Sequence, residues 1–412
     1  MTTRPTCRSC AAPLTHTFAD LGTSPVSNAF VKPNDAMRGE MFYPLHALVC
    51  GQCWLVQLAE DGAAQAHFHD DYIYFSSFSS SWLAHAARYA SAVTARFGLG
   101  PRSRVMEIAS NDGYLLQYFV KAGIPCLGIE PTANTAAAAR GNGVETRELF
   151  FGRATAAQLA AEGGQVDLLL GNNVLAHVPD INDFVGGMPL VLKPEGVITL
   201  EFPHLLQLIA ENQFDTLYHE HYSYLSLTAL MPVFARAGLR LFDVEQLPTH
   251  GGSLRIYACH AGAAQADTGA VDACLAQEQA AGLTRIETYA AFGEQVRETK
   301  RALLSFLIDA KRAGRSFAAY GAPAKGNTLL NYCGVSTDFI DYAVDRNPLK
   351  QGCLLPGSRI PVMAPERIMQ TRPDYLLILP WNIKDEVMAQ MQAIRQWGGK
   401  FVIPIPRVEV IE

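Results

Sequence analysis

The fold class follows from residues 104–113, which read RVMEIASNDG. Arg104–Ile108 has the length of a short strand, and Asn111-Asp112-Gly113 is a turn that begins a helix. The same order comes again at once, with a strand at Pro125–Ile129 and an alanine-rich helix at Asn134–Arg140. Strands that alternate with helices in this way form a parallel sheet with helices on both faces. The stretch therefore predicts a doubly wound α/β sheet.

Further strands continue this sheet along the chain. Val166–Leu170 and Val197–Phe202 read as two more strands, and a turn at Leu192–Gly196 precedes the second of them. Arg240–Glu245 and Leu254–Ala258 look like an antiparallel pair that closes the sheet.

A second α/β unit follows a helical, Ala/Glu/Gln-rich connector at residues 265–312. Its loop Gly321–Gly326 leads into a helix at Asn327–Tyr332. Both sheets are Rossmann-like, but they are not sequence repeats. The strands of the second sheet are expected at Phe317–Tyr320, Phe339–Val344, Tyr375–Leu379 and Lys400–Ile403.

Length and composition exclude several classes of protein. The chain has 412 residues, of which 49% are hydrophobic and 17% charged, so it can bury a core and is not disordered. Its formal charge of −6 argues against a protein that binds nucleic acid or an anionic membrane through a basic surface. Apolar runs such as Tyr375–Leu379 are too short for a transmembrane helix, and the N-terminus has no apolar signal core. We expect a cytoplasmic protein that acts as a monomer.

Four of the nine cysteines form two Cys-x-x-Cys pairs, Cys7/Cys10 and Cys50/Cys53. Each pair directs two thiolates to one point, so the two pairs together suit a tetrahedral zinc ion. The alternatives are unrelated turns with free thiols, or a redox pair, which is disfavoured because neither pair lies in a βαβ pattern. Four thiolates leave no open position for catalysis, so the predicted zinc ion is structural.

The pattern divides the chain into three domains. We expect a zinc-binding domain at residues 1–66, the first sheet with a helical lead-in at 67–260, and the connector with the second sheet at 261–412. The lead-in helix is expected at Trp82–Arg96, directly after the aromatic and hydroxyl-rich stretch Tyr72–Ser81. These hydroxyls can simply cap the helix, but they also describe a phosphate-binding site at a helix N-terminus.

The loop at Glu107–Gly113 has the form of the first loop of S-adenosylmethionine (SAM) methyltransferases. An acidic residue ends the strand, and small residues let the methionine part of the cofactor approach. Glu130 ends the next strand, where a carboxylate can bind both ribose hydroxyls, and Asn172-Asn173 lies where contacts near the donor methyl are made. A dinucleotide is the alternative cofactor, disfavoured by the missing second glycine. Cofactor contacts are expected from Glu107, Ala109, Ser110, Asn111, Asp112, Glu130, Pro131, Asn172, Asn173 and His177.

Two segments at the carboxyl edge of the first sheet look catalytic. His177 follows one strand, and Tyr218-His219-Glu220-His221 follows the next. His219 and His221 are two residues apart and do not share a helix face, so general acid–base catalysis is favoured over a metal site.

Taken together, these motifs make the chain similar to the SAM-dependent nucleotide-sugar C-methyltransferases, which make branched-chain deoxysugars. The resemblance covers nearly the whole chain. One departure is visible, because the first SAM loop of that family more often reads Gly-Cys-Asn-Asp-Gly. The motifs that carry the resemblance are the two cysteine pairs, Tyr72–Ser77, Ala109–Gly113, Asn172–Pro179, Tyr218–His221, Leu247–Gly252 and Tyr320–Gly326.

The resemblance implies a 4-keto nucleotide sugar as the substrate. A C–H bond next to the ketone can be deprotonated to an enolate, whose carbon then attacks the sulfonium methyl. By analogy, His221 is the base and Glu220 fixes the tautomer of a neighbouring histidine. Tyr218, His177 and Tyr72 would steady the enolate oxygen or orient the sugar.

The loop Gly321–Gly326 places Lys325 at a helix N-terminus, and such a loop can hold a diphosphate. A plain strand–helix turn is the alternative, and no Gly-Lys-Ser/Thr makes it a Walker A loop. We expect the sugar nucleotide in the cleft between the two sheets, with Ser76–Ser81 on the opposite wall. Substrate contacts are expected from Tyr74, Ser76, Ser77, Ser79, Ser80, Tyr222, His250, Lys325 and Asn327.

Two other functions stay open at this stage. An O- or N-methyltransferase of a small molecule needs no enolate. A zinc-containing nucleic-acid-binding protein with a methyltransferase-like fold is disfavoured by the acidic charge and the lack of a basic stripe. Within the favoured function, positions 3 and 5 of the sugar both flank a C4 ketone and fit equally.

Overall fold

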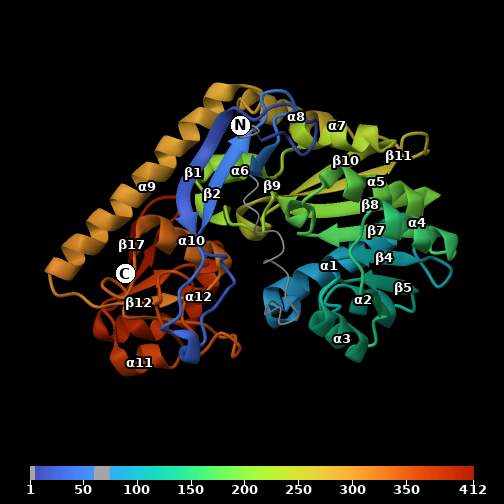
Figure 1. Ribbon diagram of the computed structural model, residues 1–412. Helices are drawn as coiled ribbons and strands as arrows, with labels where there is room; N and C mark the ends of the chain where they lie inside the picture. Colours follow the sequence, from blue (N-terminus) through green and yellow to red (C-terminus); the bar gives the residue numbers. More distant parts are fainter. Residues whose placement is uncertain (1–4, 60–74) are drawn as a thin grey trace.

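The computed structural model describes residues 5–59 and 75–412. It contains sheets of seven, six and four strands. In Figure 1 the seven-stranded sheet lies on the right, the six-stranded sheet lies at the lower left, and the strands β1 and β2 of the third sheet lie between them.

The seven-stranded sheet is the doubly wound sheet that the sequence predicts. Its order is β10-β11-β8-β7-β4-β5-β6, parallel from β8 to β6, with β11 and β10 added in antiparallel fashion. The predicted closing pair is therefore confirmed. The strands are β4 (Val105–Ile108), β5 (Cys126–Ile129), β6 (Thr146–Arg147), β7 (Val166–Asn172), β8 (Leu192–Pro203), β10 (Leu239–Leu247) and β11 (Ser253–His260).

Two predicted boundaries in this part of the chain are wrong. The helix after the first loop begins at Leu116, because Asn111 and Gly113 hold positive φ angles that no α-helix contains. Leu192–Gly196 is not a separate turn but the first part of β8, where Leu192 pairs with Val166 before a register shift. The helices are α1 (Ser80–Phe97), α2 (Leu116–Lys121), α3 (Ala133–Gly141), α4 (Arg153–Ala161), α5 (Ile181–Val191), α6 (Leu205–Ala210) and α7 (Leu227–Arg236).

The six-stranded sheet forms the C-terminal part, in the order β14-β13-β12-β15-β16-β17. Its strands are parallel except for β17. Helix α10 (Ala324–Cys333) begins three residues earlier than predicted, because Pro323 already has the extended conformation of an N-cap residue. The strands are β12 (Phe317–Tyr320), β13 (Tyr342–Val344), β14 (Val362–Met363), β15 (Tyr375–Ile378), β16 (Lys400–Ile403) and β17 (Glu409–Ile411), and the other helices are α11 (Arg367–Thr371) and α12 (Lys384–Gln390).

The third sheet, which the sequence did not predict, joins the two halves of the molecule. It pairs β1 (His16–Ser24), β2 (Tyr43–Val49) and β3 (Val56–Leu58) with the distant β9 (Ser223–Tyr224). The predicted helical connector consists of α8 (Ala270–Ala280) and the long α9 (Ile286–Arg312), which passes along β1 (Figure 1). Phe18 of β1 stacks on Phe292 of α9 with ring centroids 4.4 Å apart, and the core around them continues into the C-terminal sheet. The N-terminal segment is thus packed into both other parts of the molecule.

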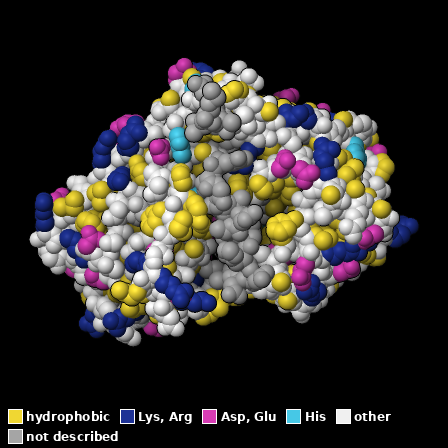
Figure 2. Space-filling view, viewed as in Figure 1, with side chains coloured by type: hydrophobic (Ala, Val, Ile, Leu, Met, Phe, Trp, Pro, Cys, Tyr) yellow, Lys and Arg dark blue, Asp and Glu magenta, His cyan; other side chains and the backbone are white. Residues whose placement is uncertain are grey.

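The surface carries both signs of charge. On the face shown in Figure 2, acidic and basic side chains are interspersed over both halves of the molecule. No helix within residues 5–59 and 75–412 combines the length and the apolar character needed to cross a membrane.

Candidate active site

His221 lies in a turn between the short helix η5 (Phe214–Thr216) and β9. Its Nδ1 is 3.0 Å from the carbonyl oxygen of Thr216, so Nδ1 carries the proton and donates to that oxygen. Its Nε2 then has a lone pair, to which the hydroxyl of Tyr218 donates at 2.7 Å. The main-chain N–H of His221 closes the turn on the carbonyl of Tyr218. The ring is therefore held as a neutral imidazole with Nε2 as its basic atom.

His177 approaches the same ring from the end of β7. It lies in the short helix η4 (Leu175–His177), and its ring centroid is 4.6 Å from that of His221 in an edge-to-face arrangement. Burial, reinforced by the charge that His177 would carry, holds the pKa of His221 well below its usual value, against the hydrogen bond to Thr216. His221 therefore remains unprotonated at neutral pH.

Glu220, next to His221 in the sequence, is buried. Its Oε1 accepts a 2.7 Å hydrogen bond from Nδ2 of Asn28, which comes from the N-terminal segment. Burial raises the pKa of Glu220 to about 7, although Asn28 and the charge of Lys350 oppose that rise. The tautomer of His221 is fixed by the carbonyl of Thr216, so Glu220 does not have the role expected for it at this ring.

Lys325 lies in the first turn of α10 and faces the junction of the two large sheets. Its Nζ donates to Oδ1 of Asn382 at 2.7 Å and lies 4.3 Å above the centre of the Trp381 ring. Nε1 of Trp381 donates in turn to the fully buried carboxylate of Asp215 at 2.7 Å. Burial lowers the pKa of Lys325 to about 8, although the Asp215 carboxylate opposes this, and burial raises the pKa of Asp215 to about 6.

The charge of this cluster acts on two buried histidines of the candidate site. The charge of Lys325 contributes to the lowered pKa values of both His221 and His250, in each case after burial. Trp381 also packs against the turn next to His250, because a Cβ atom added at Gly251 would lie 2.7 Å from the indole ring. Helix α10 thus brings a buried cation from the C-terminal sheet to the active site.

In the loop before α10, the main-chain N–H and carbonyl groups of Ala322 already have hydrogen-bond partners, so this N–H is not available to a phosphate. The N–H of Ala322 donates to Asp345 Oδ2 at 2.8 Å, and Asp345 Oδ1 accepts from Asn347 N at 2.8 Å. Lys350 Nζ donates to the carbonyl of Ala322 at 2.8 Å. Because a carboxylate already binds this loop, the side chain of Lys325 is the stronger candidate for binding an anion here.

The first loop of the seven-stranded sheet is held by Glu130, at the carboxyl end of β5 as predicted. Glu130 Oε2 accepts from the N–H of Asn111 at 2.9 Å, and Oε1 accepts from both the N–H and the hydroxyl of Thr132. Ala109 at the start of the loop has a φ of 56° and donates its N–H to the carbonyl of Ile129. Pro131, also expected at the cofactor, follows Glu130 and is half-buried.

The segment before α1 is tied to the same loop. The main-chain N–H groups of Ser76 and Ser77 donate to the side chains of Asn111 and Asp112, at 3.0 and 3.1 Å. Two serines expected at the substrate thus position the cofactor loop through their backbone. Ser79 accepts from the N–H of Trp82 and caps α1, which is the simpler of the two roles expected for these hydroxyls.

The other residues expected at the substrate have different surroundings or lie outside the described part of the chain. Ser80 is exposed at the start of α1. The ring of Tyr222 is covered by the guanidinium group of Arg8, 5.1 Å from its centroid, on the side of the cysteine cluster. Asn327 uses Nδ2 to bind the carbonyl of Ser27 at 2.6 Å. Tyr72 and Tyr74 lie outside the described residues.

Several buried polar atoms without a hydrogen-bond partner among the described residues lie in the first loop and at the end of β7. Burial raises the pKa of Glu107 well above its usual value, although a hydrogen bond with Tyr114 opposes this, and the charges of Glu130 and Asp112 raise it further. Unpaired buried polar groups are rare in native proteins, so this set fits a polar ligand such as SAM. The unpaired atoms here are Ser110 Oγ, Asp112 Oδ1, Asn172 Nδ2 and Asn173 Oδ1.

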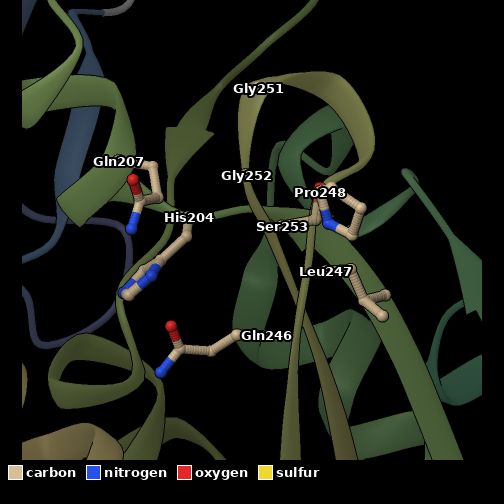
Figure 3. A pocket seen from close by; sticks show the side chains of 8 residues that line it. All are labelled: His204, Gln207, Gln246, Leu247, Pro248, Gly251, Gly252 and Ser253. Carbon is tan, nitrogen blue, oxygen red and sulfur yellow. The ribbon is translucent and has the colours of Figure 1, made fainter.

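His250, which was expected at the substrate, contacts Asn173, which was expected at the cofactor. It lies in the short helix η6 (Thr249–Gly251), and its Nε2 is 3.1 Å from Nδ2 of Asn173. Behind this turn is a pocket of about 390 Å³, which Figure 3 shows with Gly251 and Gly252 at its edge. The side chains of His204 and Gln207 line the same pocket.

The four paired cysteines come together as predicted. Cys7 Sγ lies 3.5 Å from Cys53 Sγ, Cys10 Sγ lies 3.5 Å from Cys50 Sγ, and all four sulfurs are within 4.8 Å of one another. A tetrahedral zinc ion with bonds of about 2.3 Å separates its sulfurs by roughly 3.8 Å. Gln57 donates from Nε2 to Cys7 Sγ at 3.2 Å, a typical outer contact of a thiolate ligand. The cluster therefore fits a closed structural zinc site.

The main residue that sequence reasoning missed is Glu201, in β8. Its fully buried carboxylate accepts from Arg255 Nη2 at 2.5 Å, from His85 Nε2 at 2.9 Å and from the Thr249 hydroxyl at 2.9 Å. Burial would raise the pKa of Glu201, but His85 and Arg255 hold it below its usual value. The available signal was a lone acidic residue in the otherwise apolar run VITLEF, residues 197–202.

Three family descriptions match successive parts of the chain. "Putative zinc binding domain" matches residues 7–68, "Methyltransferase domain" matches 82–244, and "C-methyltransferase C-terminal domain" matches 248–406.

The chain is also similar to individual proteins. The C-methyltransferase NovU of Streptomyces niveus is 35% identical over 408 residues, which is 98% of this chain and 96% of that protein. A ubiquinone biosynthesis O-methyltransferase of Rhodopseudomonas palustris is 26% identical over 147 residues, 31% of this chain and 58% of that protein. The solved structure of a SAM-dependent methyltransferase from Anabaena variabilis has 15% identity and a TM-score of 0.36, over 43% of this chain and 86% of that one. The similarity that extends over the whole chain is thus to a C-methyltransferase.

Proposed function

The chain belongs to the SAM-dependent C-methyltransferases, and we propose that it methylates a carbon next to the C4 ketone of a nucleotide-linked deoxysugar. The observation that carries this proposal is the His221 ring, held neutral by Thr216 and hydrogen-bonded at Nε2 to the Tyr218 hydroxyl. Methylation at carbon requires a base that removes a weakly acidic proton and a donor that stabilises the enolate oxygen. A neutral imidazole beside a phenol supplies both.

Bound SAM supplies an electrophilic methyl group on a sulfonium sulfur. Glu130 would accept the ribose hydroxyls, as carboxylates do at the end of the second strand of such sheets. The unpaired polar atoms of Ser110, Asn172 and Asn173 are available for the methionine part. SAM would therefore lie along the carboxyl edge of β4, β5 and β7.

Before substrate binds, the lone pair of His221 Nε2 is occupied by the Tyr218 hydroxyl. In the proposed mechanism the ketone oxygen takes over this hydroxyl as its hydrogen-bond donor, which frees Nε2. His221 then removes the proton from the adjacent carbon, the C=C bond of the enolate forms, and Tyr218 stabilises the negative oxygen. SAM held by Glu130, Ser110, Asn172 and Asn173 would supply the methyl group that the enolate carbon accepts, with S-adenosylhomocysteine as the leaving group. In this arrangement Nε2 of His221 stays hydrogen-bonded to the Tyr218 hydroxyl until a ketone binds.

The remaining residues would orient the sugar. His177, whose ring lies edge-to-face with that of His221, would contact the same ligand, and Tyr72 would act at the enolate oxygen. With a pKa of about 8, Lys325 is a cation at neutral pH and would bind the diphosphate. We expect the enzyme to work as a cytoplasmic monomer, without nucleic acid or membrane partners.

The decisive experiment is incubation of the purified protein with SAM and nucleotide-linked 4-keto sugars, with NMR of the products. A new methyl group bonded to ring carbon, next to C4, is the expected result. A methyl group on oxygen or nitrogen would show that the enolate chemistry is wrong. Lys325→Met should raise KM for the sugar nucleotide at least tenfold without changing the Kd for SAM, since a charged hydrogen bond contributes about 1.5–3 kcal/mol. Exchange of the exposed Lys121 for methionine is the matched control.

A further inference from the structure

Glu201 forms hydrogen bonds with two separate segments at the sheet edge where SAM is expected to bind. Its main-chain carbonyl accepts the N–H of Asn173 at 2.7 Å, and its carboxylate accepts the hydroxyl of Thr249 at 2.9 Å. The first bond fixes the end of β7, and the second fixes the turn that carries His250. A single buried residue thus sets the position of both segments.

The two residues that meet between these segments are both in strained conformations. Asn173 and His250 each have a φ of 55°, in the left-handed region that costs non-glycine residues free energy. Their side chains are joined by the 3.1 Å contact between Nδ2 and Nε2, and the ring of Trp82 lies beside the imidazole with centroids 5.1 Å apart. Strain of this kind persists where the surrounding structure enforces it, and it is concentrated at functional sites.

The hydrogen bond decides which way the Asn173 amide points. Burial, together with the charge of Lys325, lowers the pKa of His250 to about 4, although Glu201 opposes this, so the ring is neutral at pH 7. Its Nε2 can then accept a hydrogen bond, and the NH₂ group of Asn173 donates to it. Oδ1 of the same amide remains buried, with no hydrogen-bond partner among residues 5–59 and 75–412.

We propose that His250 is a positioning residue for the methyl donor: by binding the amide nitrogen of Asn173, it turns Asn173 Oδ1 toward the sulfonium methyl of bound SAM. A carbonyl oxygen attracts the polarised C–H bonds of such a methyl group and its positive charge. The opposite amide orientation would present N–H groups to the cation and repel it. This role lies on the donor side and does not depend on which acceptor the enzyme methylates.

The proposal makes a prediction about binding that needs no turnover. SAM and its demethylated product S-adenosylhomocysteine share every group except the methyl and the sulfonium charge. If Asn173 Oδ1 is no longer held in this orientation, the binding of SAM should therefore weaken more than the binding of S-adenosylhomocysteine. Isothermal titration calorimetry with each ligand measures the ratio of the two Kd values directly.

We expect His250→Leu to raise the ratio of the Kd for SAM to the Kd for S-adenosylhomocysteine roughly three- to tenfold, which corresponds to the loss of one hydrogen bond. His250→Gln places an amide oxygen near the position of Nε2 and should keep the wild-type ratio. Ser253→Ala is the control for disturbance of the turn, because Ser253 bonds the carbonyl of Thr249 but does not contact Asn173 in the described structure. Circular dichroism of each variant checks that it is folded.

A double-mutant cycle separates this role from a general structural one. If His250 acts through Asn173, His250→Leu should change the ratio little in a protein that already carries Asn173→Ala. Equal weakening of both ligands by His250→Leu, no change in the ratio, or additive effects in the double variant would each overturn the proposal. None of these results depends on the sugar substrate, so failure here is distinguishable from failure of the proposed acceptor.

Discussion

Asn28 and Glu220 are 192 residues apart in the sequence, yet Nδ2 of Asn28 donates to Oε1 of Glu220 at 2.7 Å beside the active site. The amide comes from the segment between the two cysteine pairs, and the carboxyl group directly precedes His221. The cysteine-rich part of the chain therefore contacts the turn that carries His221 directly.

This contact leads to a prediction on the pH dependence of stability. The pKa of Glu220 is about 7 in the folded protein, above the value of about 4.3 in an unfolded chain. The folded state therefore holds a proton that the unfolded state has lost, and the associated stability disappears as pH rises from about 4.3 through 7. Glu220→Gln removes this dependence.

Urea unfolding at about pH 5 and pH 8 should measure the effect. Relative to Glu220→Gln, the wild type should lose on the order of 3 kcal/mol across this interval. The exposed Glu366→Gln serves as control and should parallel the wild type. Parallel curves for the wild type and Glu220→Gln would mean that Glu220 is already ionised in the folded protein at pH 5.

His221→Asn should lower kcat by a factor of about 10²–10⁴, the usual contribution of a general base, while SAM binding stays the same. Exchange of the sugar α-proton with deuterated water, followed by NMR, should be lost with it. Tyr218→Phe should also slow both processes, because the enolate oxygen loses a donor. Retained exchange in His221→Asn would assign the base to another group.

The pH profile tests the same residue in the wild type. The pKa of His221 lies well below the usual value of about 6.5 because the ring is buried next to His177. Since the neutral form is the active base, kcat measured at saturating sugar nucleotide should not decline as pH falls from 8 to about 6.5, and should decline only below that. A decline that begins near pH 7 or above would contradict this assignment.

The cysteine cluster predicts one zinc ion per chain, which elemental analysis of tag-free protein can count. Cys7→Ser should lower the zinc content and the melting temperature, since structural zinc contributes directly to folding free energy. Cys353→Ser, outside the cluster, should change neither. Full thermal stability after complete zinc removal would contradict a structural role.

Glu130→Ala should weaken SAM binding at least tenfold, because it removes an acceptor for the ribose hydroxyls and the group that holds the N–H of Asn111. Calorimetry with SAM measures the change, and the exposed Glu145→Ala is the matched control. Unchanged SAM affinity in Glu130→Ala would mean that the ribose binds at another part of the carboxyl edge of the sheet.

The features that were predictable from sequence are local. The strands of the two large sheets are short apolar runs between turns. Glu130 directly follows β5 and Asn172 ends β7, so their place at the sheet edge could be inferred from order alone. The cysteine cluster could be inferred from spacing, because two Cys-x-x-Cys turns have few other ways to satisfy four thiolates.

The features that were missed depend on pairing across long stretches of chain. Strand β9 has two residues and no pattern of its own, so its place in the N-terminal sheet is set by the partner β3. Asp345 and Asn28 are ordinary polar residues in sequence, and only folding shows that they bind Ala322 and Glu220. The same holds for Glu201, whose three partners come from three separate segments.

The N-terminal sheet also constrains the order of events during synthesis. Strands β1 to β3 leave the ribosome before β9, but their sheet is completed by β9, at Ser223–Tyr224, and their apolar side chains share one core with α6, α9 and the C-terminal sheet. A nascent chain that ends before residue 223 therefore exposes an unpaired strand edge at β3, and Phe18 lacks the cover that α9 gives it. Truncated chains and ribosome-stalled fragments should consequently be the aggregation-prone species of this protein.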